Sequence, residues 1–433
     1  MLDRTQAPGF QSIKKVSVAQ AHSRTLANGV QLHWLDAGQQ PAIRLEYLFK
    51  AGTWHEPQRG IAHFTAKMLN EGTRRRSAAE INEYIDQFGS FMELSHGAER
   101  ITLTVYTITK HLPQLLPLLE ELLTEPVFPE RELGNLKKIT GQNLQVNSQK
   151  TAFLAQNRFR ELIFGENHPY ARHVRMPDIA LVHREALAAY FQSNVLHQPF
   201  NAVLAGQITD ETLQLVERHL AGFVVSKDTI SDTEIKVQGN GPASETIEKT
   251  DSLQSSIRFG KLLLQPDGQP VTRRSADYFA LSTLNEILGG YFGSRLMKNI
   301  REDKGFTYGI HSSLGTFRHE GFWVVGTDVK KEFTGQTLDE IRKEIRILQT
   351  EPVPPDELET VKSYLLGSFA GSVTTPFSLA DHFKTIHFDG LDYGFYDRYV
   401  ENVLQTTPET LLRLAQTYLD VEQMTEVVAG GRQ

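Results

Sequence analysis

The segment GIAHFTAKMLNEGT, residues 60–73, contains half of a possible metal site. Its apolar residues recur at helical spacing, and a helix places His63 and Lys67 four positions apart on one face. Two histidines at this spacing bind zinc in many hydrolases. A protonated lysine in the second position has no lone pair for a metal and repels it. The segment therefore predicts a helix that lacks a second zinc ligand.

Other sequence features offer no replacement for that ligand. The histidine pairs in HPYARH and HFKTIH are five positions apart, a spacing that diverges on a helix. The chain contains no cysteine, which excludes disulfides, thiolate zinc sites and cysteine nucleophiles. We therefore expect this chain to bind no metal or other cofactor by itself.

Length and charge restrict the class of protein. A chain of 433 residues is too long for one hydrophobic core, so two domains are expected. A net charge of -7, with 45 basic residues spread along the chain, argues against nucleic-acid binding. No apolar stretch of about 18 residues exists to span a membrane. Because the N-terminus lacks the apolar core of a signal peptide, we expect a cytoplasmic location, with the periplasm not excluded.

The order of predicted elements repeats along the chain. Each half alternates strands with longer helices, and LLTEPVFPEREL in the first half has a counterpart, LQTEPVPPDEL, about 225 residues later. This pattern predicts two homologous α+β halves, each a sheet with helices packed on one side. The expected boundaries are an N-terminal domain over 17–225, a polar linker over 226–247 and a C-terminal domain over 248–433.

Two segments carry a family resemblance. FKAGTWHEPQRGIAHFTAKMLNEGTRRRSAAEI resembles the zinc-motif region of the pitrilysin/insulinase family, including its mitochondrial processing peptidase branch. ILGGYFGSRLMKNIREDKGFTYGI resembles the matching segment of that family's second domain. The similarity runs in the right order from about residue 25 to the end of the chain.

The resemblance implies that the zinc site is lost. The family motif is H-x-x-E-H, in which two histidines hold zinc and the glutamate is the general base. His63 matches the first ligand, whereas Ala66 replaces the base and Lys67 replaces the second ligand. The family's third ligand is a glutamate on a later helix, but residues 133–160 contain no Asp or Glu. We then expect His63 to be held by packing or a hydrogen bond, and Lys67 to be solvated or to fill the vacated pocket.

The second half retains other parts of the family pattern. In IREDKGFTYG, Arg301 and Tyr308 match the arginine and tyrosine that contact substrate near the scissile bond. A fixed guanidinium or phenol stabilises the negative charge that forms on the carbonyl oxygen. Gly289 and Gly290 stand where the processing peptidase branch has a glycine-rich substrate loop. The other interpretation of these glycines is a turn that needs positive φ.

The resemblance leads to one main hypothesis and two alternatives. Some members of the family divide the site between two chains, and this chain resembles the one without zinc. It is then the inactive subunit of a heterodimeric peptidase, supplying Arg301 and Tyr308 to a zinc-bearing homologous partner that cuts peptides. The alternatives are a structural scaffold, like the core subunits of the cytochrome bc complex, or a homodimer that binds peptides without cutting them. An enzyme with an unrelated mechanism also remains open.

Overall fold

The computed structural model describes residues 13–226, 230, 235–239 and 241–432. Contacts divide the chain into two compact units. The N-terminal unit comprises 20–243 with 375–383, and the C-terminal unit comprises 1–19, 244–374 and 384–433. Within the expected linker, residues 227–229, 231–234 and 240 lie outside the described residues.

The N-terminal unit is built on a six-stranded sheet. Its strands are β1 (His22–Thr25), β2 (Gln31–Asp36), β3 (Ala42–Phe49), β4 (Phe91–His96), β5 (Ile101–Ile108) and β6 (Phe200–Gly206). They are ordered β1-β2-β6-β3-β5-β4, and only the β2 and β6 pair is parallel. Strand β4, which the sequence analysis did not predict, forms one edge of this sheet.

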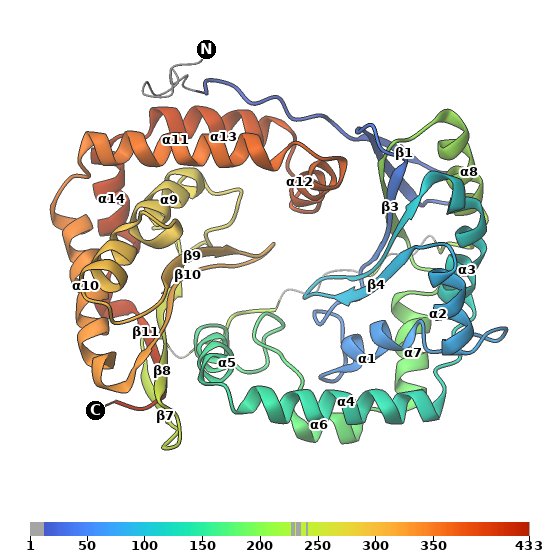
Figure 1. Cartoon of the computed structure of the whole chain (residues 1–433), viewed down its shortest axis with the longest axis horizontal. Coiled ribbons are helices and arrows are strands. Elements are labelled where there is room, and N and C mark those ends of the chain that lie inside the picture. Colours follow the sequence, from blue (N-terminus) through green and yellow to red (C-terminus); the bar gives the residue numbers. More distant parts are fainter. Residues whose placement is uncertain (1–12, 227–229, 231–234, 240, 433) are drawn as a thin grey trace, which may run out of the picture. The chain divides into compact units, whose positions relative to one another are not determined.

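Among the described residues, eight α-helices lie wholly in this unit, and Figure 1 shows several of them against one face of the sheet. They are α1 (Ile61–Met68), α2 (Ala78–Asp86), α3 (Leu112–Thr124), α4 (Glu130–Ser148), α5 (Thr151–Phe164), α6 (Met176–Leu181), α7 (Arg184–Asn194) and α8 (Asp210–Ala221), with a short 3₁₀ turn η1 (Thr109–His111). Helix α2 begins with a capping box, in which the side chains of Ser77 and Glu80 bond each other's backbone N–H groups. The central strand β3 buries both of its faces, since the adjacent residues Glu46 and Tyr47, which point to opposite faces, are 3% and 0% exposed.

The C-terminal unit repeats this topology. Its strands are β7 (Ser244–Glu248), β8 (Gln254–Leu262), β9 (Ile310–Thr316), β10 (Gly321–Lys330) and β11 (Thr425–Gly430). The order β7-β11-β8-β10-β9 reproduces β2-β6-β3-β5-β4 strand for strand, including one parallel pair at the corresponding place. The predicted α+β class with two homologous halves is therefore confirmed.

The helices of the C-terminal unit cover one face of its sheet in Figure 1. They are α9 (Tyr278–Asn285), α10 (Thr334–Thr350), α11 (Pro355–Ser372), α13 (Gly394–Gln405) and α14 (Pro408–Tyr418), with the short turns η4 (Lys331–Phe333) and η5 (Val421–Gln423). Two π-helices, η2 (Glu286–Gly290) and η3 (Met297–Asp303), follow α9. The helix that begins at Tyr278 therefore changes from α to π geometry after Asn285.

Helix α12 (Pro376–Phe388) begins in the N-terminal unit. Arg44 of β3, which is 5% exposed, donates to Asp381 at 2.8 Å and to the carbonyl of Phe377 at 2.9 Å. A buried guanidinium requires such partners, so these contacts explain why the first part of α12 groups with the first sheet. Among the described residues, no helix is long and apolar enough to cross a membrane.

Candidate functional site

His63 lies on α1 and faces the edge strand β4. Its ring packs edge-to-face on that of His96, with centroids 5.0 Å apart. Burial lowers the pKa of His63 to about 4, and the charges of His96 and Lys67 lower it further. His63 is therefore neutral at neutral pH and held by packing, which matches the expectation for it.

Lys67 and Ala66 stand at the two altered motif positions. Lys67 is exposed, but its Nζ donates to the carbonyl of Leu94 on β4 at 2.9 Å. Ala66 is fully buried in the core beneath α1. The lysine is therefore bonded to the edge strand instead of being freely solvated.

A zinc ion does not fit the residues of this site. Helix α4, which packs against α1, spans the place of the third ligand and contains no carboxylate after Glu132. Across the described part of the chain, no three His, Asp or Glu side chains gather as a metal would need. The motif positions of α1 themselves offer one imidazole and one ammonium, and neither can activate water as a zinc ion does.

A buried glutamate beside α1 was missed by the sequence analysis. Glu56 is 6% exposed, and its Oε2 accepts from the backbone N–H of Ala62 at 3.2 Å. Burial raises its pKa to about 7, although the Ala62 hydrogen bond and the charge of Arg172 oppose the shift. This carboxylate satisfies a free N–H at the start of α1, so it positions the helix.

Arg301 lies in η3, where it is covered by an aromatic ring. Its guanidinium carbon lies 4.6 Å from the ring centroid of Phe292, and its Nη1 is 3.6 Å from Glu302. Phe292 itself is 65% exposed. Sequence reasoning missed Phe292, although an aromatic residue inside a glycine-rich segment was a usable signal.

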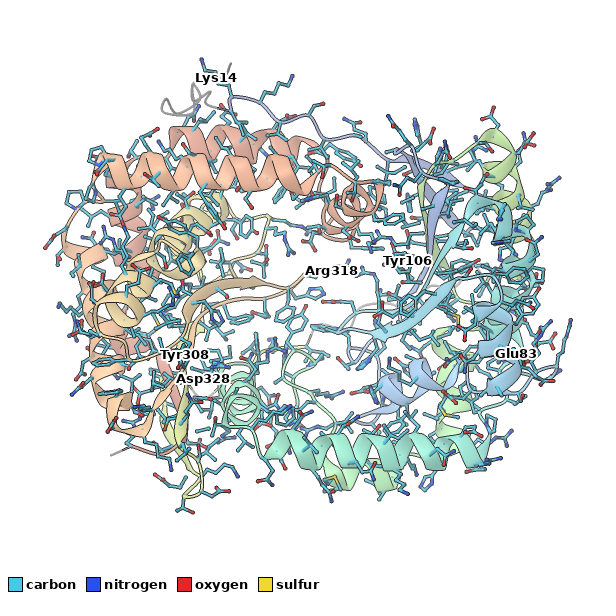
Figure 2. All side chains as sticks on the ribbon, viewed as in Figure 1. Lys14, Glu83, Tyr106, Tyr308, Arg318 and Asp328 are labelled. Carbon is cyan, nitrogen blue, oxygen red and sulfur yellow. The ribbon has the colours of Figure 1, made fainter. Side chains whose placement is uncertain are left out.

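Tyr308 is an exposed side chain on a fixed backbone. Its exposure is 96%, while Thr307 Oγ1 donates to the carbonyl of Asp328 at 2.8 Å and Thr327 Oγ1 donates to that of Gly309 at 2.9 Å. Figure 2 labels Tyr308 and Asp328 close together in this part of the molecule. Among the described residues, no hydrogen bond or ring contact joins Tyr308 to Arg301.

The glycines of the second half serve close packing. Gly289 and Gly290 lie in η2, and neither has the positive φ that the turn interpretation required. That interpretation is wrong. A Cβ on Gly289 would lie 2.7 Å from the backbone nitrogen of Ser312 on β9, so glycine lets η2 approach this edge strand.

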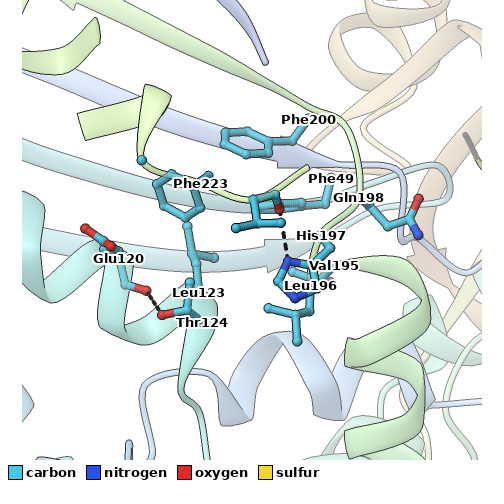
Figure 3. Close-up of a pocket in the computed structure, with 12 residues that line it drawn as sticks. Phe49, Glu120, Leu123, Thr124, Val195, Leu196, His197, Gln198, Phe200 and Phe223 are labelled. Carbon is cyan, nitrogen blue, oxygen red and sulfur yellow. Dashed lines mark hydrogen bonds between the residues drawn. The ribbon is translucent and has the colours of Figure 1, made fainter. Parts of the chain in front are cut away.

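An apolar pocket of about 220 Å³ lies elsewhere in the N-terminal unit (Figure 3). Three phenylalanine rings contribute to its lining, and His197, which has a φ of 62°, bonds the carbonyl of Val224, another lining residue. The rings are those of Phe49, Phe200 and Phe223. None of the residues predicted for the site lines this pocket.

Two family models match the chain in succession. Residues 37–178 match the model described as insulinase (peptidase family M16). Residues 182–365 match the model described as peptidase M16 inactive domain. The two matches cover the α1–β4 region and the segment with Arg301 and Tyr308, respectively.

Relatives and solved structures of similar length are found. "Uncharacterized zinc protease YmxG" of Bacillus subtilis is 22% identical over 354 residues, 79% of this chain and 82% of that protein. "Non-peptidase homolog YmxG" of Helicobacter pylori is 24% identical over 327 residues, which cover 72% of this chain and 70% of that protein. The structure of a peptidase M16 inactive domain from Pseudomonas fluorescens superposes with a TM-score of 0.83 at 22% identity, covering 95% and 98%. That of a protease from Helicobacter pylori gives 0.84 at 18% identity, covering 96% and 100%. These structures support the fold.

Proposed function

This chain belongs to the insulinase family, peptidase family M16, and we propose that it is an inactive subunit that completes the site of a zinc-bearing partner. It supplies Arg301 and Tyr308 for peptide hydrolysis, while the partner supplies zinc and the general base. The altered motif at Ala66 and Lys67 supports this division of roles. A relative named as a non-peptidase homolog agrees with the inactive half of the proposal.

The exposure of Tyr308 carries the proposal. A tyrosine that is 96% exposed contributes almost nothing to packing in this chain, yet its neighbours Thr307 and Gly309 are bonded to β10. Holding the backbone fixed while presenting the phenol outward fits a group that acts on a bound molecule. The phenol O–H donates to a developing oxyanion, and Arg301 holds carbonyls of the bound peptide.

The partner must meet this chain over a large surface. An obligate complex buries about 2,000 Å² or more, since the two half-sites have to be held within a fraction of an ångström. A homologous chain with an intact H-x-x-E-H motif would provide the zinc half. We therefore place this chain in a heterodimer.

Peptidase activity on a quenched fluorescent peptide tests this function. The chain is measured alone with zinc, and then mixed with an H-x-x-E-H relative from the same genome. Activity only in the mixture is expected, and Tyr308→Phe should lower its kcat more than tenfold. Tyr364→Phe, a half-exposed tyrosine on α11 of the same unit, is the matched control. Chelator-sensitive activity of the chain alone, or an unchanged kcat with Tyr308→Phe, contradicts the proposal.

Capture of peptides without cutting is a second candidate. The edge strand β4 favours peptide capture, because no other described strand pairs with the outer side of β4. Phe91 on this strand is 60% exposed. An extended peptide adds to such an edge through main-chain hydrogen bonds. Fluorescence anisotropy of a labelled peptide with the chain alone tests this candidate. Saturable binding without cleavage supports peptide capture. If the chain alone binds no peptide and the mixture shows no peptidase activity, the scaffold alternative is left.

A further inference from the structure

The pocket in Figure 3 is a cavity of about 220 Å³ that the proposed function does not use. Its walls include the rings of Phe49, Phe200 and Phe223, all of which are buried. The Phe200 ring contacts the other two, with centroids 5.0 Å from Phe49 and 5.4 Å from Phe223. A cavity of about 150 Å³ with such a lining is enough to bind benzene. The pocket therefore has room for one aromatic ring with a short chain.

The pocket is open to solvent beside two of its lining residues, His197 and Val224. Val224 is 71% exposed. His197 Nδ1 donates to the carbonyl of Val224 at 3.0 Å, and the backbone N–H of Ser226 donates to the carbonyl of His197 at 2.6 Å. These two bonds hold His197 in the left-handed region, which residues other than glycine rarely adopt. The exposed side of the pocket is therefore held in place by specific contacts, and a ligand can enter there.

Three helices end at this pocket. Thr124 is the last residue of α3, Val195 follows the last residue of α7, and Gly222 follows that of α8. The C-terminus of a helix carries about half a negative charge, which favours a cation. Neither α3 nor α7 has a basic residue in its last turn, whereas α8 has Arg218 and His219. Among the described residues, no Lys or Arg lines the pocket.

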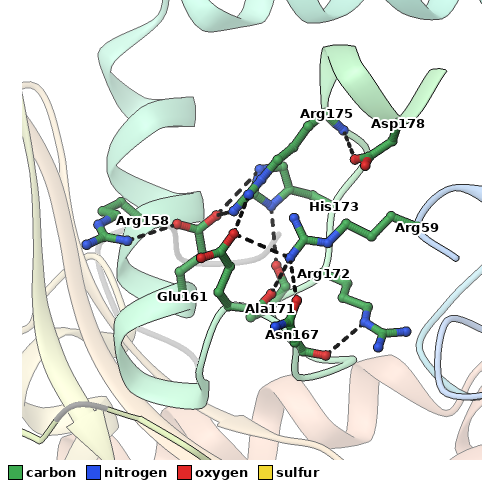
Figure 4. A network of polar contacts seen from close by, with 10 residues as sticks. Arg59, Arg158, Glu161, Asn167, Ala171, Arg172, His173, Arg175 and Asp178 are labelled. Carbon is green, nitrogen blue, oxygen red and sulfur yellow. Dashed lines mark hydrogen bonds and ion pairs between the residues drawn. The ribbon is translucent and has the colours of Figure 1, made fainter. Parts of the chain in front are cut away.

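Glu120 adds a carboxylate to the lining near the end of α3. Its Oε2 lies 3.8 Å from Nδ1 of His219, and burial lowers the pKa of His219 to about 4, so this ring is neutral at neutral pH. Elsewhere in the unit carboxylates are balanced by arginines, as Figure 4 shows for Glu161, which accepts from Arg158 at 3.2 Å and from Arg175 at 2.6 Å. In the part of the chain that the structure describes, no Lys or Arg forms such a pair with Glu120.

We propose that this pocket binds a small organic ammonium ion, with its apolar or aromatic body against the phenylalanine rings and its charged group toward Glu120 and the helix ends. The faces of aromatic rings also attract a cation. The lining supplies apolar walls and negative charge but no basic side chain, so an anion of the same size is disfavoured. The inference does not depend on the peptidase function, because neither Arg301 nor Tyr308 lines this pocket.

Isothermal titration calorimetry with three probes of similar size tests the charge preference. Phenethylamine is an ammonium ion at neutral pH, phenethyl alcohol is its neutral counterpart, and phenylpropionate is an anion. Phenethylamine should bind at least about tenfold more tightly than the alcohol, because only the ammonium gains from the negative charge around the pocket. Phenylpropionate should bind more weakly than the alcohol.

Three variants test the place of binding. Glu120→Gln should weaken phenethylamine by about fivefold and leave phenethyl alcohol unchanged, since it removes only a half-exposed charge. Glu83→Gln, at an exposed glutamate of α2 outside the pocket, is the matched control and should change neither affinity. Val224→Trp places a large ring at the exposed side of the pocket and should abolish binding of both probes. The melting temperature of each free variant checks that it is folded.

Several results would overturn the proposal. Equal affinities for phenethylamine and phenethyl alcohol, or tighter binding of phenylpropionate, exclude a site for an ammonium ion. Phenethylamine that still binds Val224→Trp, or that does not bind the unaltered chain, excludes this pocket as its site. A peptide with an N-terminal phenylalanine carries the same ammonium and ring. If it competes for the pocket at least about tenfold more tightly than phenethylamine, the occupant is a peptide and not a small molecule.

Discussion

Two corners of the molecule occupy the same place in the duplicated fold and differ in how they treat their polar groups. In the N-terminal unit, α1 follows β3 and packs beside the edge strand β4. In the C-terminal unit, α9 and η2 follow β8 and lie beside the edge strand β9. At the first corner the motif residues of α1 contact the edge strand, whereas at the second corner Phe292 and Tyr308 are exposed.

The difference is visible in particular contacts. At the first corner Lys67 bonds the carbonyl of Leu94, and His63 packs on His96. At the second corner Phe292 and Tyr308 are exposed, and Arg301 lies against the Phe292 ring. The altered motif positions of α1 thus lie in the core or bond the edge strand, while Phe292 and Tyr308 of the second corner are exposed.

The largest expected effect comes from restoring the base at the first corner. Ala66→Glu puts a carboxylate at a fully buried position and should lower the free energy of unfolding by about 3 kcal/mol. Phe292→Glu introduces a carboxylate at the exposed second corner and should change the free energy of unfolding by less than about 1 kcal/mol. Urea unfolding followed by circular dichroism compares the two variants. Equal losses of unfolding free energy would contradict the distinction between the corners.

Acid should weaken the first corner through His63. Its pKa is about 4 in the folded chain, below the ordinary value of 6.5, so the unfolded chain binds more protons between these pH values. The contribution of neutral, buried His63 to the free energy of unfolding is therefore fully present above pH 6.5 and is lost as the pH falls toward 4. His63→Gln should reduce the loss between pH 7 and 4.5 by about 2 kcal/mol. Identical pH profiles for the two proteins would show that His63 titrates normally.

A smaller effect is expected from Lys67. Lys67→Met removes the hydrogen bond to the Leu94 carbonyl and should lower stability by about 1 kcal/mol. Hydrogen exchange should become faster in β4 but not in β9, because only β4 loses a contact. Lys298→Met, at an exposed lysine of η3, is the control. The same exchange rate in β4 before and after Lys67→Met would mean that the bond contributes nothing.

The smallest effect on stability is expected at the most exposed residue. Tyr308→Ala should change the free energy of unfolding by less than about 0.5 kcal/mol, because the ring is 96% exposed. Thermal unfolding measures this directly. A fall of several degrees would show that Tyr308 packs within this chain, and its proposed role toward a partner would lose its support.

The sequence predicted much of the fold from patterns that are local. Alternation of apolar residues predicted β2, β3, β5, β6, β8, β9 and β10, and the repeated TEP segments predicted the duplication. Strand β4 was missed because FMELSH mixes apolar and polar residues without strict alternation. The change to π geometry in η2 was missed because it depends on the approach of Gly289 to Ser312, a contact 23 positions away.

The sequence by itself determined the chemistry that this chain lacks, because residue type alone settles that Ala66 cannot accept a proton and Lys67 cannot bind zinc. It also determined the two-part α+β fold, since periodicity is a local property. Only the tertiary structure decided that Lys67 bonds β4 and that Phe292 covers Arg301. Burial and pairing depend on which distant segments meet, and no local pattern contains that information.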